Sequence, residues 1–333
     1  MARDRDGGEM TTRRNLLVML GAAGAPRALF AQAKKPPVVI GWLHGTGTNK
    51  ASLTAFKEGL AALHHTEGAS YVIEARWAEG RLGQLPALAD ELKQKKPAVI
   101  VTYLDVATQA AAKAAPGTPI VQAVGASPVD AGLARSLARP GGMVTGLTNL
   151  PGELSSKYLE LLIAAAPKLK RVGFLIDSTA RHARAHQETA RRALEHYRVE
   201  GRFAEVGKPE DLRLALAQLA KEEVQGLVLM PSNWLAVEGA NIAKLALANR
   251  WPVVAGPQSF AVAGALLTYN SDALALCRRA AYYVDRILKG AKPGDLPIEQ
   301  PLNFLLTVNL KTAKALGLTM PPEIMVRATR VIE

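Results

Sequence analysis

The chain has 333 residues, which is long for one globular core, so two domains of ordinary size are expected. Hydrophobic residues make up 49% of it and charged residues 21%, a balance that excludes a disordered or fibrous chain. The aromatic share of 5% favours a helix-rich α/β fold over an all-β sandwich. The net charge of +12 is scattered over helix faces and loops, without interleaved aromatic residues, so no nucleic-acid partner is expected.

The N-terminus has the features of an export signal. Two adjacent arginines precede an apolar run over 16–25, and 31–33 (Ala-Gln-Ala) has a small-x-small cleavage pattern. The run is shorter than the roughly 20 residues that a membrane-spanning helix needs, and the arginine pair fits a twin-arginine signal. We therefore expect a signal peptide over 1–33, a mature chain from about Lys34, and a periplasmic location.

Strands and helices alternate along the mature chain. Apolar or alternating runs predict strands at 38–42, 71–77, 98–101, 119–121, 172–176, 199–206, 226–230 and 252–254. The segments between them predict helices at 52–64, 85–95, 106–114, 183–196, 212–222 and 237–249. Continuous apolar strands separated by helices are typical of parallel sheets covered on both faces.

The two halves of this pattern resemble each other. In each, an apolar strand leads through a helix to a strand that begins with proline, at 118–121 and at 251–254. This weak duplication predicts an α/β fold with two doubly wound, Rossmann-like lobes. The segment 147–154, with its proline and glycine, is expected to be the link between the lobes.

Ligands of such sheets bind at the carboxyl ends of the strands, where the loops here are rich in hydroxyls, amides and glycine. The candidate ligand-binding residues are His44, Thr46, Thr48, Tyr103, Asp105, Ser127, Asp177, Ser178, Ser232, Trp234, Gln258 and Asn270. The hydroxyl and N–H groups at 46, 48, 127 and 178 are expected to hold a carboxylate or another polar end of a solute. Tyr103 and Trp234 would pack against its apolar part, although Trp234 is equally consistent with a packed helix cap.

No catalytic set assembles on these loops. The glycine-rich segment 45–50 lacks the third glycine of a dinucleotide motif and the Gly-Lys-Ser/Thr of a P-loop. His182 and His186 have the spacing of a metal-binding pair, but the sequence lacks the glutamate of a zinc protease, and two surface histidines are the favoured interpretation. Cys277 is expected to pack within a helix. The sequence predicts no enzyme, no cofactor and no metal.

Three blocks carry a family resemblance: RWAEGR at 76–81 with LPALA at 85–89, SLARPGGMVTGL at 136–147, and YVDRILKGAKP at 283–293 with NLKTAKALGL at 309–318. They resemble the ABC transporter substrate-binding proteins related to the tryptophan/tyrosine binders, over nearly the whole mature chain. The resemblance implies a type I periplasmic-binding-protein fold whose lobes close on a solute by hinge motion. It further implies a monomer that works with a membrane permease and its cytoplasmic ATPase.

The resemblance also implies several crossings between the lobes. On that basis lobe 1 is expected over 34–149 and lobe 2 over 150–268. Residues 269–295 would return to lobe 1, and 296–333 would return to lobe 2.

Two departures from the family concern acidic residues. Ser127 lies in an Ala-Ser-Pro-Val segment where the family commonly has Gly-Asp-Pro-Val, and Asp105 lies where it often has a Gly-Thr-Pro-like loop. An acid is missing from one loop and present in a neighbouring one, which leaves an amino acid and an organic acid both open as the solute. An exported nucleotide-dependent α/β enzyme and a sensor that docks on a membrane receptor are the alternative functions.

Overall fold

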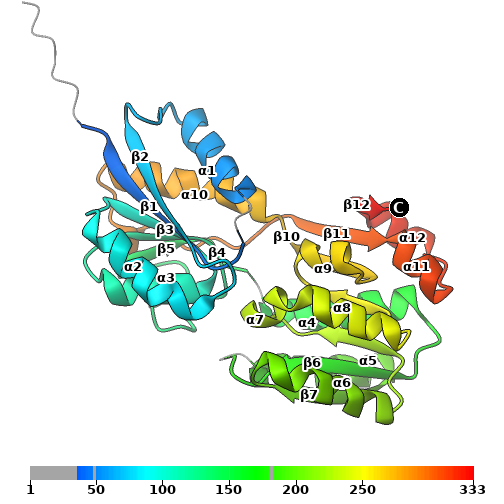
Figure 1. The fold of residues 1–333 in the computed structure, drawn as a ribbon. Coiled ribbons are helices and arrows are strands. Elements are labelled where there is room, and N and C mark those ends of the chain that lie inside the picture. Colours follow the sequence, from blue (N-terminus) through cyan, green and yellow to red (C-terminus); the bar gives the residue numbers. More distant parts are fainter. Residues whose placement is uncertain (1–35, 48–49, 150, 181–182) are drawn as a thin grey trace, which may run out of the picture. The chain divides into compact units, whose positions relative to one another are not determined.

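Two β-sheets flanked by helices organise the chain (Figure 1). The computed structural model describes residues 36–333 except 48–49, 150 and 181–182. The expected signal peptide therefore lies outside the described residues. Both sheets belong to one compact unit, Pro37–Glu333. Among the described residues, no helix is long and apolar enough to cross a membrane.

The first sheet has five parallel strands in the order β2-β1-β3-β4-β5. These strands are β1 (Val38–His44), β2 (Tyr71–Trp77), β3 (Val99–Tyr103), β4 (Ile120–Val124) and β5 (Val144–Gly146). The sequence predicted the first four. It missed β5 because three buried residues are too few to show a period of two.

Helices cover both faces of this sheet. They are α1 (Ala51–Ala62), α2 (Leu85–Gln94), α3 (Asp105–Ala114) and α10 (Ala273–Leu288). Trp42 packs with α1 and α10, whereas its neighbour Leu43 packs with α2 and α3, because successive strand residues point to opposite faces. Gly59 lets α1 approach α10 closely: a Cβ atom there would lie 2.4 Å from the carbonyl oxygen of Arg278.

The second sheet has seven strands in the order β12-β11-β10-β9-β8-β6-β7. These strands are β6 (Arg171–Asp177), β7 (Glu200–Val206), β8 (Gly226–Leu229), β9 (Val253–Ala255), β10 (Leu267–Ser271), β11 (Phe304–Asn309) and β12 (Arg330–Ile332). All neighbours pair in parallel except β10 and β11, which are antiparallel. The sequence predicted β6 to β9 and missed the three strands that follow.

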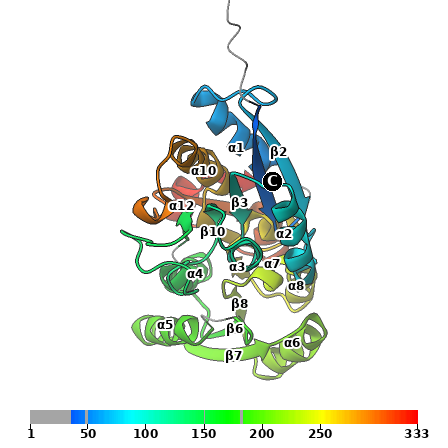
Figure 2. The same cartoon turned by 90° about the vertical axis from the view of Figure 1, so that its left-hand side faces the viewer.

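The remaining helices lie between residues 151 and 327. They are α4 (Pro151–Ala165), α5 (Ala183–Tyr197), α6 (Leu212–Lys221), α7 (Asn233–Val237), α8 (Gly239–Ala248), α9 (Gln258–Ala263), α11 (Leu310–Leu316) and α12 (Pro322–Arg327). Short 3-10 turns occur at Leu82–Gln84, Pro209–Asp211 and Pro293–Asp295. Figure 2 shows α5 and α6 on opposite faces of β6 and β7. Phe174 packs on the α5 side and Leu175 on the α6 side.

Two sequence predictions of elements were wrong in detail. The helix expected over 237–249 is α8, which begins two residues later, at Gly239, and it follows a short helix, α7, that the sequence did not predict. The link expected over 147–154 is shorter, because α4 begins at Pro151, and proline is favoured in the first turn of a helix. Residues 269–271, expected to return to lobe 1, lie in β10 of the second sheet. The other lobe boundaries stay a prediction.

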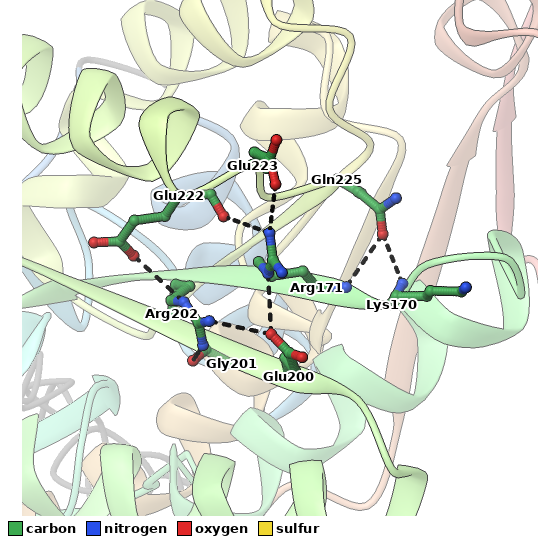
Figure 3. Close-up of polar contacts among 8 residues, drawn as sticks. All are labelled: Lys170, Arg171, Glu200, Gly201, Arg202, Glu222, Glu223 and Gln225. Carbon is green, nitrogen blue, oxygen red and sulfur yellow. Dashed lines mark hydrogen bonds and ion pairs between the residues drawn. The ribbon is translucent and has the colours of Figure 1, made fainter.

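An ion-pair network ties the amino ends of β6 and β7 to the turn before β8 (Figure 3). Arg171 donates to Glu200 and to Glu223, each at 3.1 Å, and Arg202 also donates to Glu200 at 3.1 Å. The side-chain oxygen of Gln225 accepts from the backbone N–H groups of Lys170 at 2.6 Å and Arg171 at 3.2 Å. The network therefore supports strand register at the edge opposite the carboxyl ends.

Candidate functional site

A cavity of about 990 Å³ is lined by residues from the carboxyl ends of strands in both sheets. His44 ends β1, Tyr103 ends β3, Asp177 ends β6 and Ser271 ends β10, and all four line the cavity. Pockets of about 300–1,000 Å³ at this edge of α/β sheets are typical small-molecule sites. The cavity is therefore the candidate site.

Most of the residues singled out in the sequence meet on this cavity. Nine of them line it: His44, Thr46, Tyr103, Asp105, Asp177, Ser232, Trp234, Gln258 and Asn270. Ser127 and Ser178 are not among the lining residues. Ser127 Oγ accepts from the backbone N–H of Asp130 at 3.3 Å, and Ser178 is exposed. Thr48 lies outside the described residues.

His44 is held as a neutral imidazole. Its Nδ1 atom lies 2.6 Å from the carbonyl oxygen of Thr46. Because a carbonyl only accepts, this nitrogen carries the ring proton and Nε2 is left as an acceptor. Burial lowers the pKa of His44 to about 4, although the bond to Thr46 opposes the shift. At neutral pH the ring thus offers a hydrogen-bond acceptor without a positive charge.

Aromatic rings surround this imidazole. The ring of Tyr103 stacks on His44 with centroids 4.1 Å apart and an interplanar angle of 17°. Trp77 lies on the imidazole at 4.8 Å. Burial raises the pKa of the Tyr103 phenol, which therefore stays protonated. The cavity wall at the ends of β1 and β3 is flat, aromatic and uncharged, and suits the apolar part of a solute.

The loop between β3 and α3 has an unusual backbone conformation. Leu104 has φ of +84°, which favours glycine, and it lines the cavity. Its N–H donates to the carbonyl of Val124 at 2.7 Å, and its carbonyl accepts from the hydroxyl of Thr108 at 3.2 Å. This turn places Asp105 in the first turn of α3, on the cavity wall.

Asp177 joins two loops of the second sheet. One carboxylate oxygen accepts from Ser232 Oγ at 2.7 Å. The other accepts from the backbone N–H of Thr179 at 2.8 Å and from its hydroxyl at 2.5 Å. Ser232 Oγ also accepts from the N–H of Leu235 and so caps α7. The carboxylate is thus fixed beside the cavity by three donors that are themselves neutral.

Acidic side chains dominate the charge of the cavity. Glu79, Asp105, Asp177 and Asp272 line it, whereas no lysine or arginine is among the described lining residues. This contrasts with the net charge of +12 on the whole chain. A cavity with this lining attracts a solute that carries a positive group.

Three polar atoms on the cavity wall are buried without a hydrogen-bond partner. They are Ser52 Oγ, Trp234 Nε1 and Thr307 Oγ1. In the part of the chain that the structure describes, only Trp42 Nε1 shares this property. Buried polar groups are nearly always paired, so three unpaired atoms at one cavity mark them as groups available to hydrogen-bond a solute.

Sequence reasoning missed several lining residues. Asn149 accepts from the hydroxyl of Ser271 at 2.7 Å, and Tyr158 reaches the cavity from α4, a helix that was not predicted. The interpretation of His186 as a surface residue was wrong: it is 3% exposed, and its Nδ1 lies 2.9 Å from Ser155 Oγ. His182 lies outside the described residues. The signal for His186 was its helical spacing with the buried Ala190.

Known proteins match both the sequence and the fold. The family model described as "ABC transporter substrate binding protein" matches residues 39–332. A tyrosine-binding protein of Clostridioides difficile (strain R20291) is 24% identical over 268 residues, which are 79% of this chain and 75% of that protein.

Two solved structures have the same fold. One, an ABC domain from Streptococcus pneumonia in complex with L-Trp, is 22% identical with a TM-score of 0.80 and covers 89% of this chain and 100% of its own. The other, a conserved domain protein from Vibrio cholerae, is 24% identical with a TM-score of 0.80 and covers 88% and 99%. The expected type I periplasmic-binding-protein fold is confirmed. Substrate-binding proteins of ABC transporters bind small solutes, work with a membrane permease and are generally extracytoplasmic. This chain belongs to the family of ABC transporter substrate-binding proteins.

Proposed function

We propose that this protein captures an amino acid with an aromatic or other large apolar side chain in the periplasm and delivers it to an ABC permease. In this proposal the signal peptide is removed and the mature protein acts as a monomer. The observation that carries the proposal is the lining of the cavity, where carboxylates meet a flat aromatic wall.

The carboxylates account for one end of the solute. An ammonium group gains from the negative charges of Asp105 and Asp177 in a partly buried site, where screening by salt is weaker than in bulk water. The same charges oppose a dicarboxylate or a nucleotide such as ATP, whose ionised groups are negative. Between the two solutes that the sequence left open, the lining favours the amino acid over the organic acid.

The aromatic residues account for the other end. A ring that packs on Tyr103 and Trp234 would bury apolar area and offer an edge to His44. His44 Nε2 would accept a hydrogen bond from an N–H or O–H donor of that ring. The amide groups of Gln258 and Asn270 would complete the polar contacts from the second sheet. The relatives that bind tyrosine and L-Trp support such a solute.

The experiment is to purify the mature chain from Lys34 and identify co-purified solutes by native mass spectrometry. Isothermal titration calorimetry follows, with the amino acids, a panel of organic acids, NAD and ATP. We expect one solute per chain, tightest binding for an aromatic amino acid, and no chemical change of the bound compound. Preferred binding of a dicarboxylate or a nucleotide, or turnover of any of these compounds, would contradict the proposal.

A further inference from the structure

We infer that the N-terminus of α1, with the hydroxyl of Ser52, is the subsite that binds the carboxylate of the solute. The inference rests on the proposed function and assigns the carboxylate to a residue, Ser52, that is not among the candidates from the sequence. The question behind it is how a cavity lined by carboxylates holds the negative end of an amino acid, since an uncompensated carboxylate is costly to bury.

The N-terminal end of α1 lies on the cavity wall. α1 has 12 residues, and both Ala51 and Ser52 line the cavity. Its N-cap residue, Lys50, makes no side-chain cap, and no acidic residue lies in its first turn. The N–H groups of Ser52 and Leu53 have no acceptor within the described part of the chain. Free N–H groups at a helix N-terminus attract and bind anions.

The side chain of Ser52 supports the subsite independently of the backbone. Ser52 is 7% exposed, and its Oγ atom is buried without a hydrogen-bond partner. Side chains of a helix tilt toward its N-terminus, so this hydroxyl points to the end where the N–H groups of Ser52 and Leu53 lie. An unpaired buried hydroxyl destabilises the empty protein, and a ligand oxygen that accepts from it removes that penalty.

Two other long helices, α3 and α10, also begin on the cavity. Asp105 already lies in the first turn of α3. Asp272 caps α10, where one of its oxygens accepts from the N–H groups of Leu274 and Ala275, both at 3.0 Å. These ends are occupied or faced by acidic side chains, which repel a second carboxylate. Among these three helix ends, α1 is the one that suits the solute's negative group, while the acids at the other two suit its ammonium group.

The test compares three compounds that share one ring: L-tyrosine, its decarboxylated amine tyramine, and its deaminated acid 3-(4-hydroxyphenyl)propionate. Calorimetry measures their affinities for the wild-type mature chain and for Ser52→Ala. Thr54→Ala is the matched control, since it removes an exposed hydroxyl from the same helix. The thermal midpoint of each empty protein shows that the variants fold.

We expect Ser52→Ala to weaken binding of tyrosine and of the deaminated acid about tenfold, and to leave tyramine within about twofold. Thr54→Ala should leave all three affinities unchanged. Equal weakening of tyrosine and tyramine, or no weakening of either, would overturn the subsite while the proposed function stands. If wild type binds no amino acid, the proposed function fails. The subsite then stands only if wild type binds the deaminated acid and Ser52→Ala loses it.

Discussion

The imidazole of His44 lies nearly parallel to the phenol ring of Tyr103, with the two centroids 4.1 Å apart. The stack joins the ends of β1 and β3, which are neighbours in the first sheet. The orientation of the imidazole is fixed by the bond between its Nδ1 and the carbonyl of Thr46. Because burial keeps this ring neutral, the stack is a source of pH dependence.

The stability of the empty protein should therefore depend on His44 in mild acid. The pKa of His44 is about 4 in the folded protein, against the ordinary value of 6.5 that applies in the unfolded chain. Between these values the unfolded chain binds more protons, so the free energy of unfolding falls as the pH drops from about 7 to 4. The loss attributable to His44 approaches about 3 kcal/mol.

Urea denaturation of wild type and His44→Gln at several pH values between 4 and 7 measures this contribution. Glutamine has no titrating group, so the difference between the two proteins should shrink steadily as the pH falls. Carboxylates that titrate in the same range affect both proteins alike and cancel. A difference that does not change with pH would show that His44 is not buried as a neutral ring.

Gln122 should be essential for the shape of the site, although it does not line it. Its side-chain nitrogen donates to the carbonyls of Ala126 and Leu147, each at 2.9 Å. Its oxygen accepts from Thr108 Oγ1 at 2.9 Å. Gln122→Met should lower the free energy of unfolding by about 2–3 kcal/mol, because the buried carbonyl of Leu147 and the partly buried carbonyl of Ala126 lose their donor.

Because Ala126 lies on the cavity wall, Gln122→Met should also weaken solute binding. Urea denaturation and calorimetry on the same samples measure both effects. Gln225→Met is the matched control: this glutamine is exposed, and its side chain accepts from two N–H groups far from the cavity. We expect it to leave solute affinity unchanged. Normal binding by a stable Gln122→Met protein would argue against the positioning role.

Gly59→Ala should be destabilising even though alanine is the better helix former. Alanine gains about 1 kcal/mol over glycine within an exposed helix. At this position, however, the new Cβ would lie 2.4 Å from the carbonyl oxygen of Arg278 and 2.8 Å from the Cβ of Ala281. Forcing α1 away from α10 should cost about 1–3 kcal/mol and reverse the sign. Thermal unfolding measures the change, and Gly117→Ala, which meets nothing within 4 Å, is the control.

Whether a strand was predicted from the sequence depended on the length of its apolar run. Apolar strands such as β1 and β6 were found because four or more consecutive buried residues lie between helices. The short strand β5 and the antiparallel pair β10 and β11 were missed, because their pairing partners are distant in sequence and leave no local pattern. The returns of the chain between the lobes, expected only from the resemblance to the family, stay a prediction.

The site residues were predicted at the ends of strands. This explains which lining residues were predicted correctly and which were overlooked. His44, Tyr103 and Asp177 end strands and lie on the cavity. Ser52 was missed because its importance lies in an absent hydrogen bond, which only coordinates reveal. His186 was misplaced because a polar residue on a charged helix looks exposed until the packing of α4 against α5 is known.

Asp177→Asn should separate the charge of the cavity from its hydrogen bonds. Asparagine has nearly the same shape, its oxygen can still accept from Thr179, and its amide can donate to Ser232 Oγ in place of the bond at 2.7 Å. The variant should thus fold normally and lose only the negative charge. Affinity for an amino acid or its amine should fall about tenfold, while affinity for the deaminated acid should rise.

Calorimetry with the three tyrosine-related compounds gives this comparison directly. Asp130→Asn is the control, because that carboxylate is exposed and is not among the lining residues. It should shift none of the affinities, since an exposed charge is screened within about 10 Å at moderate salt. Equal losses for the amine and the acid in Asp177→Asn would mean that the residue acts through loop structure alone. Opposite changes are what a charge-selective cavity requires, because only the electrostatic contribution changes sign with the solute.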